Sequence, residues 1–188
     1  MIRIGITGSL ASGKTTASKI ISNGRGPLFS ADLVVKKLYS QKKFRKLVAK
    51  KFNLKIDIHF IKKIKNIILE KKGTLKKLEK IIHPLVRKSM HNFSKINKSK
   101  KFAFFEIPLL VESKLIKYFD VIIFIKSKKS LRLKRYISKG GNSKLFNFLD
   151  RQQVKVNKKT KYCDYIVVNN SSLNVLKRNL LNIIKFYE

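Results

Sequence analysis

One glycine-bearing stretch near the start of the chain constrains its fold most strongly. Residues Gly8 to Thr16 read GSLASGKTT, and the part up to Thr15 matches the phosphate-loop pattern G-x-x-x-x-G-K-[ST] in full. A short apolar run, IRIGIT, precedes the stretch, and a segment with helical spacing follows it. Because this pattern binds phosphate when it joins a strand to a helix, the sequence predicts a nucleotide-binding loop here.

Each residue type in this loop has a chemical reason to be there. Gly8 and Gly13 permit backbone angles that turn successive N–H groups toward an anion, and the helix start adds its positive dipole end. Lys14 is expected to reach the β- and γ-phosphates, and the Thr15 hydroxyl is expected to ligate Mg²⁺. Thr16 is expected to donate to the α-phosphate. The other loop residues expected to bind ATP are Ala11 and Ser12.

Apolar runs alternate with longer helical patterns along the chain, which predicts an α/β fold with a parallel sheet of about five strands flanked by helices. The expected strands are Ile2–Thr7, Leu28–Ser30, Phe102–Glu106, Val121–Ile125 and Tyr165–Val168. The expected helices are Thr15–Ser22, Asp32–Tyr39, Phe44–Lys51, Ile58–Lys71, Leu75–Phe93, Leu109–Lys117, Ser130–Ser138 and Leu173–Phe186.

The length of 188 residues suits one domain, residues 1–188, with two insertions in the sheet framework. Residues 40–101 hold several helical patterns with no strand between them, and residues 139–163 are polar and rich in lysine. The second region is open to two interpretations, a solvated loop or a lid that closes over a nucleotide.

No apolar run approaches the length of a membrane span, and no signal-like leader opens the sequence, so we expect no membrane partner. Cys163, the one cysteine, cannot form a disulfide within the chain and fits a reducing compartment. A cytoplasmic location is therefore the expectation.

The charge balance is unusual, with 45 Lys and Arg against 10 Asp and Glu and a net charge of +35. Such a charge favours binding of nucleic acid or another polyanion, or else reflects compositional drift toward lysine, isoleucine and asparagine. Because the lysines spread over the whole chain, they do not favour a specific nucleic-acid site. Anionic substrates would be attracted in either case.

A carboxylate follows the second expected strand in the segment LFSADLVV. Since the carboxyl ends of parallel strands line the ligand crevice, Asp32 is placed to accept a proton from an incoming hydroxyl. Its alternative role is to cap the following helix.

Two further segments, HPLVR and EIPLLVE, carry polar residues suited to an acceptor site. A His-Pro pair inside a helical pattern predicts a break or kink at His83, and Arg87 one turn later suits phosphate binding. Glu106 ends the third expected strand, where it could hold Mg²⁺ through water or position the acceptor. Pro108 is expected to turn the chain into a helix that carries Glu112. The alternatives are a structural histidine, a strand-end acid at Glu106, and a Glu112 that orients a neighbouring basic group.

Taken in order, the loop GSLASGKTT, the segments ADLV, HPLVR and IPLLVE, and the late segment CDYIVVN resemble the dephospho-coenzyme A kinase family. The resemblance implies a P-loop kinase fold with an acceptor-binding helical insertion at 40–101 and a lid at 139–163. It also implies ATP-dependent phosphorylation of the ribose 3′-hydroxyl of dephospho-CoA, the last step of CoA biosynthesis.

The resemblance assigns roles by position. Asp32 corresponds to the general base, and Asn169 lies where the chain returns beneath the adenine. Gln153 corresponds to a glutamine that precedes the basic lid segment. The residues that correspond to the dephospho-CoA pocket are Asp32, His83, Arg87, Glu106, Pro108, Leu109 and Glu112.

The chain departs from the family pattern at several positions. Ser9 and Ala11 stand where glycines are common, and Ser30 replaces the first acid of an Asp-Ala-Asp segment. Lys139 stands where an arginine often opens the lid, and it cannot form a two-pronged contact to phosphate. We expect Arg135 and Lys139 to be the lid cations that act on the transferring phosphoryl group.

Two other functions share part of this pattern. A P-loop kinase for another small acceptor, such as a nucleoside or a nucleotide, would use the same loop but does not predict HPLVR and IPLLVE in this order. A basic NTPase that depends on nucleic acid is supported by the charge alone. The sequence makes no prediction of oligomeric state.

Overall fold

The computed structural model describes residues 1–188, and the chain forms two compact units. Unit 1 comprises residues 1–30 and 93–188, and unit 2 comprises residues 31–92. Unit 2 covers most of the helical insertion expected at 40–101, beginning and ending earlier along the chain. No helix in either unit is both long enough and apolar enough to span a bilayer.

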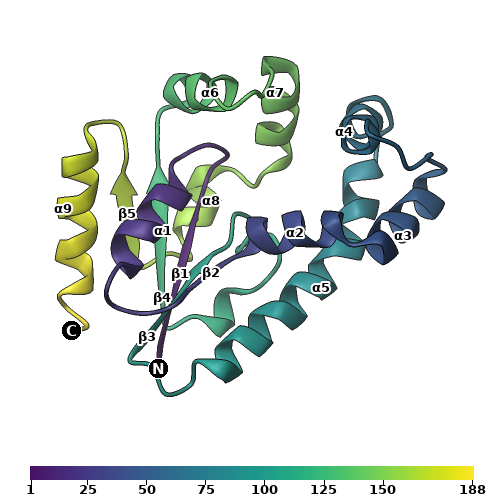
Figure 1. Ribbon diagram of the computed structural model, residues 1–188. Coiled ribbons are helices and arrows are strands. Elements are labelled where there is room, and N and C mark those ends of the chain that lie inside the picture. Colours follow the sequence, from purple (N-terminus) through teal and green to yellow (C-terminus); the bar gives the residue numbers. More distant parts are fainter. The chain divides into compact units, whose positions relative to one another are not determined.

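Unit 1 is built on five parallel strands in the order β2-β3-β1-β4-β5 (Figure 1). The strands are β1 (Ile2–Gly8), β2 (Leu28–Ser30), β3 (Phe102–Glu106), β4 (Val121–Lys126) and β5 (Tyr165–Val168). β1 lies in the centre and pairs with β3 on one side and β4 on the other. The predicted α/β fold with a five-stranded parallel sheet is therefore confirmed.

The sheet is buried on both faces, which explains why its strands read as continuous apolar runs. On one face the side chains of β1, β3 and β4 pack against α1 (Lys14–Ser22) and α9 (Leu173–Ile184). This core comprises Ile4, Ile6, Ala17, Ile21, Phe102, Phe104, Val121, Ile123, Ile125, Val167, Leu176, Leu180 and Ile184. On the other face Gly5 leaves room for the side chains of Leu110 and Phe119.

Residues 139–163 are more ordered than their polar composition predicted. α6 (Lys129–Ile137) is followed by α7 (Ser143–Gln152) and by the short α8 (Val156–Thr160). α7 forms because Asn142 caps its start, accepting a hydrogen bond from the Leu145 N–H at 2.8 Å, and because Leu145 and Phe146 are buried. The interpretation of this region as a solvated loop is therefore wrong.

The helix expected over Leu109–Lys117 is not formed. A series of turns follows β3, and only a 3-10 helix, η1 (Ile116–Tyr118), is regular. Lys114 has a left-handed backbone (φ 56°), which cannot continue an α-helix. The apolar spacing of IPLLVESKL thus reflects a buried loop.

Unit 2 is entirely helical, with α2 (Ala31–Ser40), α3 (Lys42–Phe52), α4 (Phe60–Glu70) and α5 (Thr74–Ile96), whose last turn extends into unit 1. Of the break or kink predicted at the His-Pro pair, a break is not formed, because α5 continues through Pro84 as one helix. Proline removes one backbone hydrogen bond there, while Leu78, Val86 and Met90 remain buried along the helix.

Candidate active site

The phosphate loop joins the end of β1 to the start of α1, as predicted. A Cβ at Gly8 would lie 2.4 Å from the Ile125 carbonyl oxygen, and one at Gly13 would lie 2.2 Å from Asn169 Nδ2. Gly13 also has φ +97°. Both positions therefore require glycine, because any side chain would displace the backbone of β4 or the amide of Asn169.

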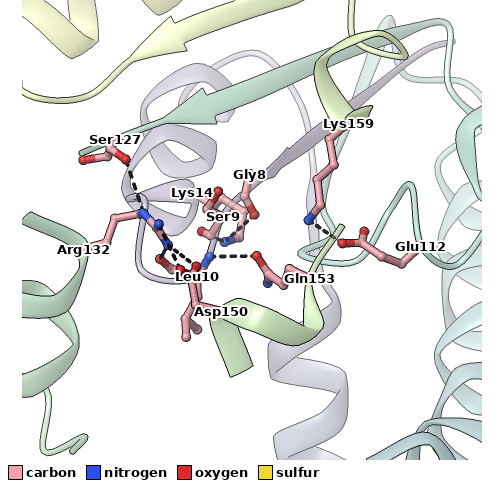
Figure 2. A network of polar contacts seen from close by, with 10 residues as sticks. All are labelled: Gly8, Ser9, Leu10, Lys14, Glu112, Ser127, Arg132, Asp150, Gln153 and Lys159. Carbon is pink, nitrogen blue, oxygen red and sulfur yellow. Dashed lines mark hydrogen bonds and ion pairs between the residues drawn. The ribbon is translucent and has the colours of Figure 1, made fainter. Parts of the chain in front are cut away.

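Lys14 folds back along its own loop and is only 7% exposed. Its Nζ donates to the Ser9 carbonyl oxygen at 2.9 Å and to that of Gly8 at 3.3 Å (Figure 2). The ammonium group is therefore held by the loop that is expected to bind the β- and γ-phosphates.

Three oxygen-bearing side chains meet where β2 and β3 end and α1 begins. Glu106 is 1% exposed, and its two carboxylate oxygens each accept a hydroxyl. Thr15 Oγ1 donates to Oε1 at 2.5 Å, and Ser30 Oγ donates to Oε2 at 3.0 Å. This hydroxyl–carboxylate cluster offers hard oxygen ligands of the kind that Mg²⁺ prefers, so the residues present fit a magnesium ion.

Leu10, at the outer turn of the loop, has both of its backbone polar groups bonded to side chains from the 129–153 region (Figure 2). Its N–H donates to Gln153 Oε1 at 3.2 Å, and its carbonyl oxygen accepts from Arg132 Nη1 at 3.2 Å. Arg132 is 6% exposed, forms an ion pair with Asp150 at 2.5 Å and donates to the Ser127 carbonyl oxygen at 3.3 Å. α6 and α7 are thereby fixed to the loop.

Arg135, on α6, and Asn169, directly after β5, both bond to the same loop. Arg135 donates to the Ser12 and Asn169 carbonyl oxygens at 3.4 and 3.1 Å, and Asn169 Nδ2 donates to the Ser12 carbonyl oxygen at 2.9 Å. Lys139 lies in the turn between α6 and α7, where its side chain is exposed and forms no hydrogen bond or ion pair. The structure thus brings Arg135 and Asn169 to the loop and leaves Lys139 on the surface.

Glu112, in the loop after β3, contacts residues 154–159, which follow α7 in the 139–163 region. Its Oε1 forms an ion pair with Lys159 Nζ at 2.5 Å and accepts a hydrogen bond from the Val154 N–H at 3.2 Å. Lys159 is 1% exposed. If Glu112 orients a neighbouring basic group, as the alternative interpretation has it, that group is Lys159.

The other acceptor-side candidates divide between the two units. In unit 1, the Pro108 carbonyl oxygen accepts from Thr7 Oγ1 at 3.2 Å, and that of Leu109 accepts from the Ser113 N–H at 2.8 Å. In unit 2, Asp32 lies in the first turn of α2, and His83 and Arg87 lie one turn apart on α5. Burial, together with the nearby charge of Arg87, lowers the pKa of His83, so its imidazole is neutral at pH 7.

Comparison with known proteins identifies the family. Residues 2–174 match the family described as dephospho-CoA kinase. A dephospho-CoA kinase of Rickettsia conorii is 31% identical over 189 residues, covering 100% of this chain and 98% of the relative. The chain belongs to the dephospho-CoA kinase family.

Solved structures agree with this membership. A dephospho-CoA kinase from Campylobacter jejuni is 26% identical with a TM-score of 0.66, and the match covers 97% of this chain and 95% of that one. A Thermus thermophilus protein, TT1252, shares the fold with a TM-score of 0.78 at 24% identity, over 98% of this chain and 97% of its own. The family, the fold and the enzyme class predicted from the sequence are therefore confirmed.

The site of this dephospho-CoA kinase family member contains residues that the sequence did not single out. Arg132 pairs with Asp150 and Lys159 pairs with Glu112, yet Arg132, Asp150 and Lys159 belong to no recognised motif. One feature of the sequence could have indicated Asp150. The chain has only 10 acidic residues, so an acid within a lysine-rich region indicates a specific partner. The roles assigned to individual catalytic and binding residues remain predictions.

Proposed function

We propose that this chain transfers the γ-phosphoryl group of ATP to the ribose 3′-hydroxyl of dephospho-CoA, giving ADP and CoA. One observation carries the proposal beyond family membership. The phosphate loop, with the buried Lys14, adjoins the cluster in which Glu106 accepts hydroxyls from Thr15 and Ser30. This arrangement supports binding of a nucleoside triphosphate at a place where the Glu106 carboxylate can help to hold its Mg²⁺.

Thr15 and Glu106 are the residues that would hold Mg²⁺. When bound, the ion supplies positive charge to the oxygens of the phosphates. Lys14 stabilises negative charge on the β- and γ-phosphates from its place on the loop, and the amides of Ser12 and Gly13 contribute dipoles at the start of α1.

Asp32 is the proposed general base. It lies two residues after Ser30, the last residue of β2, and in the first turn of α2. The 3′-oxygen attacks the γ-phosphorus and forms the new P–O bond, while the bond between the γ-phosphorus and the β,γ-bridging oxygen breaks. The hydroxyl proton passes to the Asp32 carboxylate, and ADP leaves with the bridging oxygen.

Residues 139–163 are proposed to act as a lid that excludes water from the reacting phosphates. Arg135, which already contacts the loop through Ser12, and Lys139, which has the freedom of an exposed side chain, are the proposed lid cations. The residues proposed to bind the acceptor are, within unit 1, Pro108, Leu109 and Glu112. Within unit 2, they are His83 and Arg87, which lie one turn apart on α5. We also place the reaction in the cytoplasm, where a chain with one cysteine needs no disulfide.

The test is phosphate transfer from ATP·Mg²⁺ to dephospho-CoA, with the product identified by mass. Adenosine, AMP, shikimate and water are offered as alternative acceptors. We expect selective formation of the 3′-phosphate. Clear transfer to another acceptor and none to dephospho-CoA would overturn the proposed substrate and leave the nucleotide site intact.

The variant that tests the base is Asp32→Asn. It should still bind ATP but lose transfer by a factor of 10² or more, on the order expected for general-base catalysis. Asp57→Asn is the matched control. It also removes a carboxylate from unit 2, but this carboxylate pairs with Lys63 and is not proposed to act on the substrate. Turnover of Asp32→Asn close to that of the control would exclude Asp32 as the base.

A further inference from the structure

A five-residue segment at the end of α7, Asp150–Val154, contacts three different parts of unit 1, and Figure 2 shows the contacts of Asp150 and Gln153. Asp150 pairs with Arg132 of α6, and Gln153 accepts the N–H of Leu10 in the phosphate loop. The next residue, Val154, donates its N–H to Glu112 in the loop after β3. The segment is thus bonded at adjacent positions to the nucleotide loop and to the loop that carries the proposed acceptor contacts.

The Glu112–Lys159 ion pair holds the chain that directly follows this segment. Lys159 is fully buried on α8, and Glu112 is mostly buried, with 16% of its side chain exposed. The same carboxylate oxygen binds Lys159 Nζ and the Val154 N–H, so the chain from Val154 to Lys159 closes on one acceptor atom. Gln153, which accepts the Leu10 N–H, directly precedes Val154, so this closure adjoins the contact with the phosphate loop.

We propose that Glu112 and Lys159 are positioning residues that couple the lid to both substrate loops. This inference rests on the proposed function. Their ion pair holds the lid so that Gln153 reaches Leu10 only when the loop after β3 is in place. The reacting phosphates are then shielded from water while the acceptor is aligned. Glu112 acts through Val154 and Lys159, without itself touching the reacting atoms.

The chemistry of the pair separates this role from a stabilising one. Removing one member leaves a buried charge without its partner, which destabilises a protein, whereas replacing both members with uncharged side chains is often neutral for stability. A pair that served stability alone would therefore be replaceable as a pair. A pair that positions the lid would not be replaceable in this way, because the contact between carboxylate and ammonium defines where residues 154–159 lie.

The experiment uses the double variant Glu112→Gln/Lys159→Met, together with each single variant. Transfer to dephospho-CoA, ADP formed per CoA formed, and the thermal midpoint are measured for each. We expect the single variants to unfold at lower temperature and the double variant to recover most of that loss. The double variant should still turn over on the order of tenfold more slowly, because misplaced reacting groups cost rate.

The deciding measurement is the ratio of ADP to CoA. In the double variant this ratio should rise at least about twofold above that of the unaltered protein, because water enters an imperfectly closed site. A ratio unchanged from the unaltered protein overturns the coupling, whatever the rate. The matched control, Arg3→Met/Asp120→Asn, removes an exposed ion pair at the opposite end of the sheet and should leave the ratio unchanged.

The unaltered protein separates failure of this inference from failure of the proposed function. If it makes no CoA, the proposed function is wrong. If it makes CoA and the double variant does so with an unchanged ratio, only the positioning role is wrong.

Discussion

Ala11 has a left-handed backbone conformation (φ 57°) in the middle of the phosphate loop. This region costs a residue with a Cβ about 1–2 kcal/mol relative to its preferred conformations. The loop therefore contains local strain at a position where glycine is common in the family, and the two required glycines on either side cannot relieve it.

Ala11→Gly should raise the free energy of unfolding by up to about 1 kcal/mol. The gain from the relieved backbone exceeds the extra freedom that glycine has in the unfolded chain. Urea denaturation followed by circular dichroism measures the change, and Ala49→Gly inside α3 is the contrasting variant that should lose stability. A loss of stability in Ala11→Gly would show that the left-handed turn is unstrained.

His83 gives a pH-dependent contribution to stability. Burial lowers the pKa of His83 below its usual value of 6.5, and the charge of Arg87 adds to this effect. Since the folded state binds the proton less readily, the contribution is fully present above pH 6.5 and is lost as the pH falls through the lowered pKa.

The measurement is thermal or urea unfolding of the native chain and of His83→Gln from pH 7.5 to pH 5. The native chain should lose more stability than the variant over this interval. The carboxylates of Asp57 and Asp120 titrate lower and affect both proteins alike, because partners lower their pKa values as well. Parallel curves for the two proteins would contradict the expected role of His83.

Among the elements, those buried on both faces were the most predictable from sequence. Each of the five strands was predicted to within one residue, because apolar runs such as FAFFE and VIIFI have only one way to be buried between helices. α7 was missed, because its apolar residues form one short cluster, LFNFL, within a region that is otherwise polar and rich in lysine. The turns after β3 were mistaken for a helix, because helical spacing of apolar residues also suits a loop that packs into the core.

The residues of the candidate site were predictable only where a sequence motif determines the backbone conformation. The loop residues follow from glycine and helix-terminus chemistry, which depend on adjacent positions. Arg132 and Lys159 depend instead on partners 18 and 47 positions away, Asp150 and Glu112. A single sequence does not reveal such pairings, because the buried Arg132 and Lys159 have the same sequence context as the many exposed lysines and arginines of this chain.

Arg132→Gln should weaken the connection between α6, α7 and the phosphate loop. It removes the charge that binds Asp150 and the Leu10 carbonyl oxygen, so we expect the KM for ATP to rise on the order of tenfold. Arg178→Gln on the exposed side of α9 is the matched control. Equal KM values in steady-state assays of the two variants would show that the loop holds its shape without Arg132.

The whole molecule carries a net charge of +35 on 188 residues. Such a field attracts anions from a distance and is screened by salt. The charge is spread over both units, since lysines occur on nearly every exposed helix face. It therefore suits general attraction of phosphorylated substrates better than recognition of a nucleic-acid sequence.

Added KCl should lower kcat/KM for dephospho-CoA on the order of tenfold between 50 and 500 mM while kcat changes little, because encounter is slowed and chemistry is not. RNA should act as a weak competitor at low salt without stimulating ATP turnover. Steady-state rates over a KCl series, with and without RNA, give both results. ATP turnover that requires RNA would instead assign the charge to a nucleic-acid function.

The bond from Asn169 to Ser12 joins positions 157 residues apart. The ribosome makes the nucleotide-binding motif well before the groups that hold it in shape, because Arg132, Gln153 and Asn169 all come more than 100 residues later. Proteins fold as they are synthesised only where the required contacts have already left the ribosome. In this chain the motif is therefore made long before it can acquire its final form, and a product truncated before Arg132 would expose an incomplete ATP site.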